Sequence, residues 1–166
     1  MCTGSAVTIR PLSAEDRAWV SSHTADLFGG RVVISRGVAH RPEELPGFVA
    51  CKGSERVGLA IYRFVGDACE LVTLDALVQW AGIGTALLEA VERSALQAGC
   101  GRVWLITTND NVDALRFYQR RGYVLSAVYP NAIETSRALK PSIPRIGQFG
   151  IPIRDELQLA KPLQDG

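Results

Sequence analysis

The hydrophobic pattern of the chain changes from a strand period to a helix period near residue 80. Before that point, apolar runs at residues 47–51, 57–65 and 69–78 are separated by short turns rich in glycine and polar residues. This spacing predicts an antiparallel meander of three strands. After that point, apolar residues recur every three or four positions from Ile83 to Leu96, which is typical of an amphipathic helix.

The other segments extend this order into a mixed α/β (α+β) fold with a mostly antiparallel sheet. A continuous apolar run at residues 103–107 follows the helix, so this strand and the one at residues 69–78 should be parallel and joined by a right-handed crossover. Residues 131–155 are expected to form an irregular arm, because three prolines interrupt them. The remaining expected elements are strands at 6–10, 31–36, 123–129 and 156–161, helices at 13–28 and 111–121, and a loop at 40–46.

Length, charge and cysteine spacing narrow the functional classes. The 166 residues fit a single domain spanning residues 1–166. A net charge of +1 argues against a nucleic-acid-binding protein, which usually carries a marked basic excess. No apolar stretch approaches the roughly 18 residues of a membrane span, and no secretion signal begins the chain. We therefore expect a cytoplasmic protein, and its four scattered cysteines indicate free thiols and no metal site.

A glycine-rich segment stands between the strand at residues 69–78 and the helix that follows it. Gly82 and Gly84 would let a ligand approach the backbone closely, and the first N–H groups of the helix are unpaired and lie at the positive end of its dipole. The segment is a candidate pyrophosphate site, although an ordinary glycine-rich turn explains it equally well. A dinucleotide-binding GxGxxG loop is excluded because Leu87 replaces its last glycine, and the Gly-Lys-Ser/Thr end of a Walker loop is absent.

Two motifs stand in order around this segment, separated by one expected strand. The first is an Arg/Gln-x-x-Gly-x-Gly/Ala loop, which Gln79, Gly82 and Gly84 match without a gap. The second is an Asn, a small residue, an aromatic-Tyr pair and a Gly-aromatic ending, and here it runs from Asn111 to Tyr123. The chain therefore resembles the GNAT (Gcn5-related N-acetyltransferase) family, most strongly over residues 57–129.

The resemblance implies that the fourth and fifth strands, in the family's order, run parallel and splay apart in a V, with acetyl-CoA bound in the gap. The backbone of Val72, Thr73 and Leu74 would hold the pantetheine arm and the acyl carbonyl. Asn111 would reach the cofactor from the second helix. The pyrophosphate would be held by the loop, whose cofactor-binding residues would be Gln79, Trp80, Ala81, Gly82, Ile83, Gly84 and Thr85.

One part of the loop departs from the family pattern. Trp80 and Ala81 stand where family members often carry basic residues, so phosphate binding would depend more on backbone amides. Arg120 and Arg121, at the end of the second helix, are candidates to compensate near the phosphates. The sequence favours the other interpretation, in which they form the solvated C-terminal face of that helix.

The resemblance also implies the chemistry, which is transfer of an acyl group from a thioester to an amine. Tyr118 matches the family's general acid, and a phenol with a pKa of about 10 can protonate a thiolate. A general base is less clear, because Ile106 replaces the glutamate of some members. Glu70 is the best substitute, since the strand period of two places it on the same face as Leu74. Asp75 would point to the opposite face, and a chain of water molecules is the further alternative.

These expectations describe an acetyl-CoA-dependent N-acetyltransferase that acts on a primary amine of a small molecule. A non-catalytic acyl-CoA sensor of the same fold and a protein acetyltransferase are the alternatives. No acceptor-binding residue is assigned. The apolar segment at residues 140–154 is expected to cover either the acceptor site or a partner subunit in a homodimer.

Overall fold

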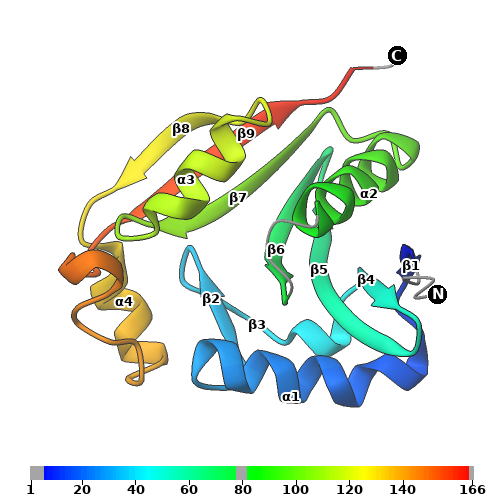
Figure 1. Ribbon diagram of the computed structural model, residues 1–166. Helices are drawn as coiled ribbons and strands as arrows, with labels where there is room; N and C mark the ends of the chain where they lie inside the picture. The colour runs from blue at the N-terminus through cyan, green and yellow to red at the C-terminus, as the bar shows by residue number, and fades with distance from the viewer. Residues whose placement is uncertain (1–5, 78–81, 165–166) are drawn as a thin grey trace.

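The computed structural model describes residues 6–77 and 82–164, which form one seven-stranded sheet and a separate two-stranded hairpin (Figure 1). The sheet order is β1-β4-β5-β6-β7-β9-β8, and β6 and β7 are its one parallel pair among the described strands. This confirms the mixed, mostly antiparallel fold and the crossover. The strands of the sheet are β1 (Val7–Pro11), β4 (Gly47–Lys52), β5 (Glu55–Val65), β6 (Ala68–Ala76), β7 (Arg102–Thr108), β8 (Val124–Tyr129) and β9 (Glu156–Pro162).

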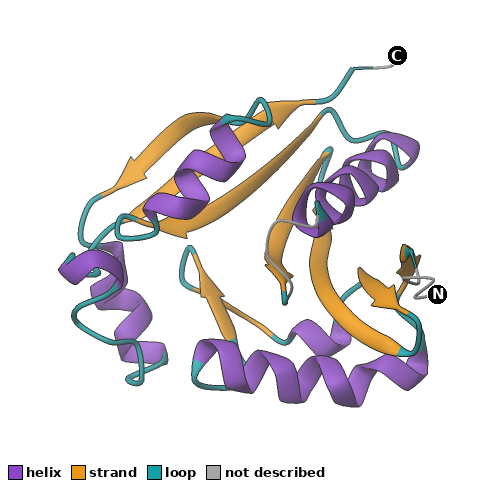
Figure 2. Ribbon diagram, in the orientation of Figure 1, coloured by secondary structure: helices purple, strands orange, loops and turns teal. Residues whose placement is uncertain are grey.

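Helices cover both faces of the sheet (Figure 2). The helices α2 (Ile83–Gln97) and α3 (Val112–Gln119) contribute Leu87, Val91 and Tyr118 to the larger apolar core. On the other face α1 (Arg17–Phe28) packs Val20 against Leu59 and Ile61 of β5. Each fully buried side chain of this kind stabilises the fold by about 1.5–3 kcal/mol. No helix in the described part of the chain is long and apolar enough to cross a membrane.

The parallel pair separates after a short contact. β6 and β7 pair only from Ala68 with Arg102 to Leu71 with Leu105. Beyond Leu105, β7 continues to pair with β9 on its other side, as far as Thr108 with Glu156. The edge of β6 that faces β7 is therefore left without a strand partner, which confirms the expected V-shaped gap (Figure 1).

A bulge in β6 lies where the two strands separate. Leu71 pairs with Tyr62 of β5 and Thr73 pairs with Ile61, so Val72 is an additional residue in β6. A bulge bends its strand and ends regular pairing. It also shifts the alternation of side chains: Leu74 packs in the core beneath α2, whereas Val72 packs on the α1 side. The prediction that Glu70 shares a face with Leu74 is therefore wrong.

The segment after α1 differs from the predicted strand and loop. It forms a hairpin of β2 (Val33–Ser35) and β3 (Val38–His40), joined by Arg36 and Gly37, which both have positive φ angles. His40, which the sequence placed in a loop, is a buried strand residue. The pattern hid this hairpin because its strands are three residues long and its turn begins with an arginine rather than the Asn or Gly that such turns favour.

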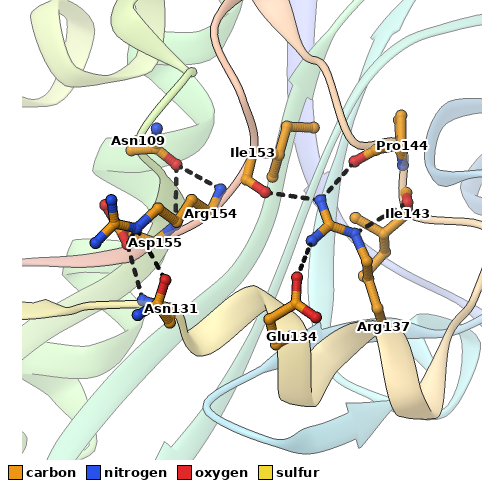
Figure 3. Close-up of polar contacts among 9 residues, drawn as sticks. All are labelled: Asn109, Asn131, Glu134, Arg137, Ile143, Pro144, Ile153, Arg154 and Asp155. Carbon is orange, nitrogen blue, oxygen red and sulfur yellow. Dashed lines mark hydrogen bonds and ion pairs between the residues drawn. The ribbon is translucent and has the colours of Figure 1, made fainter.

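The predicted irregular arm is partly wrong, because α4 (Ala132–Leu139) occupies its first third. Ile133 and Ser136 form its buried face, and the helix ends just before Pro141, where a proline is compatible with a helix end. Figure 3 shows how the arm is then fixed: Arg137 of α4 donates hydrogen bonds to three backbone carbonyls of the arm. At the other end, Asn109 Oδ1 accepts the backbone N–H groups of Arg154 and Asp155.

Candidate active site

Two open cavities meet at the gap between β6 and β7. The first, which we call the loop cavity, has a volume of about 570 Å³ and lies between residues 82–85 at the start of α2 and the length of α3. The second, the cleft cavity, has a volume of about 600 Å³ and lies between the separated parts of β6 and β7. The hairpin strand β2, α4 and the arm complete its wall. Both are lined by Leu74, Asn111, Ala114, Tyr118 and Gln148.

The start of α2 forms one wall of the loop cavity. Gly82 caps the helix with a φ of 71°, which favours glycine. At Gly84 the space is tight, because a Cβ atom there would lie 3.3 Å from Cζ of Phe117 in α3. The two motifs are thus in direct contact. Gly82, Ile83, Gly84 and Thr85 all line the cavity, whereas Gln79, Trp80 and Ala81 lie outside the described residues.

Arginines from α3 and its C-terminal end form the opposite wall. Arg116, Arg120 and Arg121 line the loop cavity. Arg121 is held in place by its Nε, which donates to Thr85 Oγ1 at 2.9 Å, and by stacking of its guanidinium 3.7 Å from the Phe117 ring centroid. Arg120 and Arg121 therefore lie beside the glycine loop. Together with the unpaired N–H groups of α2, these cations make the cavity suitable for a polyphosphate.

Asn111 begins α3, as the sequence predicted. Its Oδ1 accepts the backbone N–H of Ala114 at 3.2 Å and a longer contact from Gln148 Nε2 at 3.4 Å. Gln148 belongs to the arm, and its own backbone N–H donates to the buried Asp110. The arm therefore touches the helix start at the point where the two cavities meet.

The cleft cavity exposes the unpaired edge of β6. Leu77 N–H donates to Val57 of β5, so by the alternation of a strand the N–H of Leu74 points to the opposite edge, toward the gap. Val72 and Thr73 line the cavity beside it. Thr73 Oγ1 is buried and has no hydrogen-bond partner among the described residues. A ligand with a polar chain in the gap would satisfy these groups.

Tyr118 lies between the two cavities. Its side chain is 8% exposed and packs edge-on against the rings of Phe117 and Tyr123. Burial raises the pKa of the phenol above its usual value, so the group stays protonated through the neutral range. Tyr118 can therefore hold a proton at the junction of the cavities.

Glu70 is completely buried and lines neither cavity. Its carboxylate accepts from Arg63 Nε at 2.6 Å and from Ser35 Oγ at 2.7 Å, and Ser35 Oγ also contacts His40 Nε2 at 2.9 Å. Burial lowers the pKa of His40, against the opposing charge of Glu70. This network ties the hairpin to β6 and separates Glu70 from any ligand in the gap.

Asp75, the second choice from the sequence, points to the α1 side. Its Oδ2 lies 2.8 Å from Nε2 of His23 in α1, and the His23 ring stacks on Trp19 at a centroid distance of 4.9 Å. Asp75 borders the loop cavity but not the cleft cavity. Like Glu70, it lies on the face that the bulge separates from Leu74.

Sequence reasoning missed Glu156, the first residue of β9. It is 2% exposed, and it is the one acidic side chain that lines the cleft cavity among the described residues. The sequence carried a weak signal, because Glu156 begins the predicted last strand directly after the arm. Within the described residues, no group of three or more His, Cys, Asp or Glu side chains is arranged to hold a metal ion.

Comparison with known proteins adds family information to this geometry. The model of the acetyltransferase (GNAT) family matches residues 12–123. The uncharacterized protein YdhI of Bacillus subtilis (strain 168) is 50% identical over 131 residues, which are 78% of this chain and 81% of YdhI.

Solved structures share the fold at lower identity. An IAA acetyltransferase from Bacillus cereus ATCC 14579 superposes with a TM-score of 0.69 at 20% identity, over 95% of this chain and 100% of that chain. A GNAT family acetyltransferase from Elizabethkingia anophelis, solved with acetyl-CoA bound, gives a TM-score of 0.69 at 20% identity, over 95% of this chain and 98% of that chain.

Proposed function

Because the chain belongs to the acetyltransferase (GNAT) family, we propose that it transfers an acetyl group from acetyl-CoA to a primary amine of a small molecule. The observation that carries this proposal is the position of Tyr118. Its phenol, which burial keeps protonated, stands where the loop cavity meets the largely apolar cleft cavity. That arrangement suits a proton donor between a cofactor and an acceptor.

The residues present fit acetyl-CoA. The N–H groups of residues 82–85 and the guanidinium of Arg121 would hold the pyrophosphate. The edge of β6 at Val72, Thr73 and Leu74 would hold the pantetheine arm through backbone hydrogen bonds. Asn111 caps α3 with its side-chain oxygen, which leaves its amide nitrogen free to donate a hydrogen bond to the pantetheine of the cofactor. A protein of the same fold was solved with acetyl-CoA bound, which supports acetyl-CoA as the cofactor.

The backbone N–H of Leu74 and the phenol of Tyr118 would assist the formation of the C–N bond and the cleavage of the C–S bond. Acetyl-CoA supplies the thioester carbonyl. The N–H of Leu74 would donate to the oxyanion that forms when the amine adds to this carbonyl. Tyr118 would then give its proton to the departing thiolate sulfur as the C–S bond breaks, and would regain a proton from the nitrogen of the new amide. The phenol is thereby restored, and the net proton passes from nitrogen to sulfur.

The prediction that Glu70 is the general base is not favoured by its position, because its carboxylate is buried and lines neither cavity. To take a proton from an amine in the gap, its carboxylate would need a relay through Ser35 and His40.

The first test is the melting temperature with and without acetyl-CoA. A ligand at about one hundred times its dissociation constant stabilises the native state by about 2.7 kcal/mol, so acetyl-CoA should raise the melting temperature clearly and ATP should not. The second test is Tyr118→Phe, which should lower kcat by about 10²–10⁴-fold while the shift with acetyl-CoA stays. Release of the CoA thiol in the presence of an amine panel measures turnover.

The outcomes separate the alternatives. A shift with acetyl-CoA but no turnover with any amine, in the wild type as in Tyr118→Phe, would favour an acyl-CoA sensor. Turnover with a peptide N-terminus or lysine, and none with small amines, would favour a protein acetyltransferase. No shift at all would contradict the cofactor assignment.

A further inference from the structure

The cleft cavity has a mainly apolar wall into which one carboxylate is set. Its lining includes Leu27, Val33, Ile106, Ile133 and Ile153, from five different elements or segments. Glu156 stands among them at the first position of β9, where it pairs with Thr108 of β7 and Tyr129 of β8. A carboxylate is almost never buried in such a place unless it is paired or has a function.

The tip of the hairpin holds this carboxylate. The backbone N–H of Arg36 donates to Oε2 of Glu156 at 3.0 Å, and Nη1 of Arg36 donates to Oε1 at 3.3 Å. The guanidinium also stacks on the Tyr129 ring, 3.3 Å from its centroid. Arg36 has a φ of 48°, a left-handed conformation that is costly for a residue other than glycine, asparagine or aspartate. Such local strain is concentrated at functional sites.

The two oxygens of Glu156 keep room for another donor. An ionised carboxylate offers about four lone-pair positions, and Arg36 is its hydrogen-bond partner among the described residues. The other charged side chain in the cavity wall is Lys140, whose ammonium is engaged with the carbonyl of Val32 at 2.7 Å. The remaining lone pairs of Glu156 are open to a further donor, and a carboxylate bonds most strongly to a charged one.

We propose that Glu156 binds the ammonium group of the acceptor and takes its proton, and that the acceptor is a primary amine on an apolar body. The inference rests on the proposed acetyl transfer. The proton moves from the ammonium nitrogen to a carboxylate oxygen of Glu156, which leaves a neutral amine with its lone pair. That lone pair adds to the thioester carbonyl and forms the C–N bond, and the C–S bond then breaks as Tyr118 protonates the sulfur and regains a proton from the amide nitrogen. Glu156 releases its proton to solvent after the product leaves. Arg36 is a positioning residue, because it acts through Glu156.

The test is Glu156→Gln with two aromatic amines of similar size. Benzylamine is an ammonium ion at neutral pH, whereas aniline is neutral there and needs no base before it attacks. We expect kcat/KM for benzylamine to fall by about 100-fold, within the range of general-base effects, and that for aniline to fall by no more than about fivefold. Glu55→Gln is the matched control, since that carboxylate lies at the start of β5, is exposed and lines neither cavity.

The shift in melting temperature with acetyl-CoA keeps the test informative. If Glu156→Gln retains that shift but loses both amines equally, or loses neither, the assignment of Glu156 is wrong. If Glu156→Gln does not fold, Arg36→Lys serves instead, and it should raise KM for benzylamine more than for aniline. If the wild type turns over spermidine but not benzylamine, the apolar acceptor class is wrong. If the wild type turns over no amine, the proposed function fails and not this inference alone.

Discussion

The loop cavity and the cleft cavity differ in what their walls are made of. The loop cavity presents backbone N–H groups and arginine side chains that reach solvent. The cleft cavity presents mainly aliphatic side chains, the buried carboxylate of Glu156 and the ammonium of Lys140, which is bonded to the Val32 carbonyl. The loop cavity suits a large polyanion that stays partly hydrated. The cleft cavity suits a small ammonium ligand whose apolar part is removed from water on binding. Binding of the two ligands should therefore respond to different substitutions, with Tyr118 belonging to both sites.

The largest difference between the effect on CoA binding and the effect on amine binding is expected from Gly84→Val. Its Cβ would lie 3.3 Å from the Phe117 ring, so the two additional methyl groups of valine would crowd the wall of the loop cavity between α2 and α3. Since a phosphate must approach these N–H groups closely, we expect acetyl-CoA affinity to fall by about 100-fold or more, equivalent to about 2.7 kcal/mol. Isothermal titration with CoA measures this.

Gly101→Val is the control for that variant, because no atom lies within 4 Å of a Cβ at this position. It should leave CoA affinity unchanged. Equal loss in both variants would mean that valine acts through general destabilisation, and the loop cavity would lose its assignment.

The opposite pattern, in which amine binding is weakened and CoA binding is not, is expected from Arg137→Ala. The Arg137 side chain is 12% exposed, and its guanidinium holds the carbonyls of Ile143, Pro144 and Ile153, which belong to residues lining the cleft cavity (Figure 3). Because these bonds involve a charged donor, their loss should free the arm. We expect KM for the amine to rise by about tenfold with CoA affinity nearly unchanged.

Arg154→Ala provides the comparison within the same arm. That side chain is exposed and lines neither cavity, so steady-state kinetics should show little change in KM. If Arg137→Ala weakens CoA and leaves the amine KM unchanged, the division of roles between the cavities is wrong.

The smallest effect is expected from Arg121→Ala, which sharpens the assignment of the loop cavity. This arginine is partly exposed and competes with water for phosphate, so CoA should bind about five- to tenfold more weakly. The loss should shrink at high salt, because salt screens exposed charges. Arg102→Ala, at an exposed position outside both cavities, should change neither value. A loss that is independent of salt would indicate a packing role for Arg121 against Phe117.

The parts of this protein that are local in the chain were predictable. The N-cap at Asn111 and the helix before it follow from short patterns, and most strands appeared within one or two residues of their predicted limits. The loop cavity is formed largely by residues between 82 and 121, so its motifs stand close together in the sequence.

The parts that depend on distant contacts were not predictable. The bulge at Val72 has no sequence mark, because an additional apolar residue in an apolar strand leaves the composition unchanged. Glu156 resembles any acidic residue at a strand start until Arg36, 120 positions earlier, is placed against it. The amphipathic face of α4 was obscured by prolines that begin only after the helix ends. Each is a tertiary property, which local periodicity does not contain.

The bulge also has a consequence for the geometry of the whole sheet. Without Val72, β6 would alternate regularly, and Leu71, Thr73 and Leu74 would keep the faces they have now. The packing of the sheet would be preserved, but nothing would bend β6 away from β7, and their pairing could continue past Leu105. One additional residue in β6 therefore accompanies the change from a paired to an open parallel ladder, and the width of the site depends on a backbone irregularity as much as on the side chains that line it.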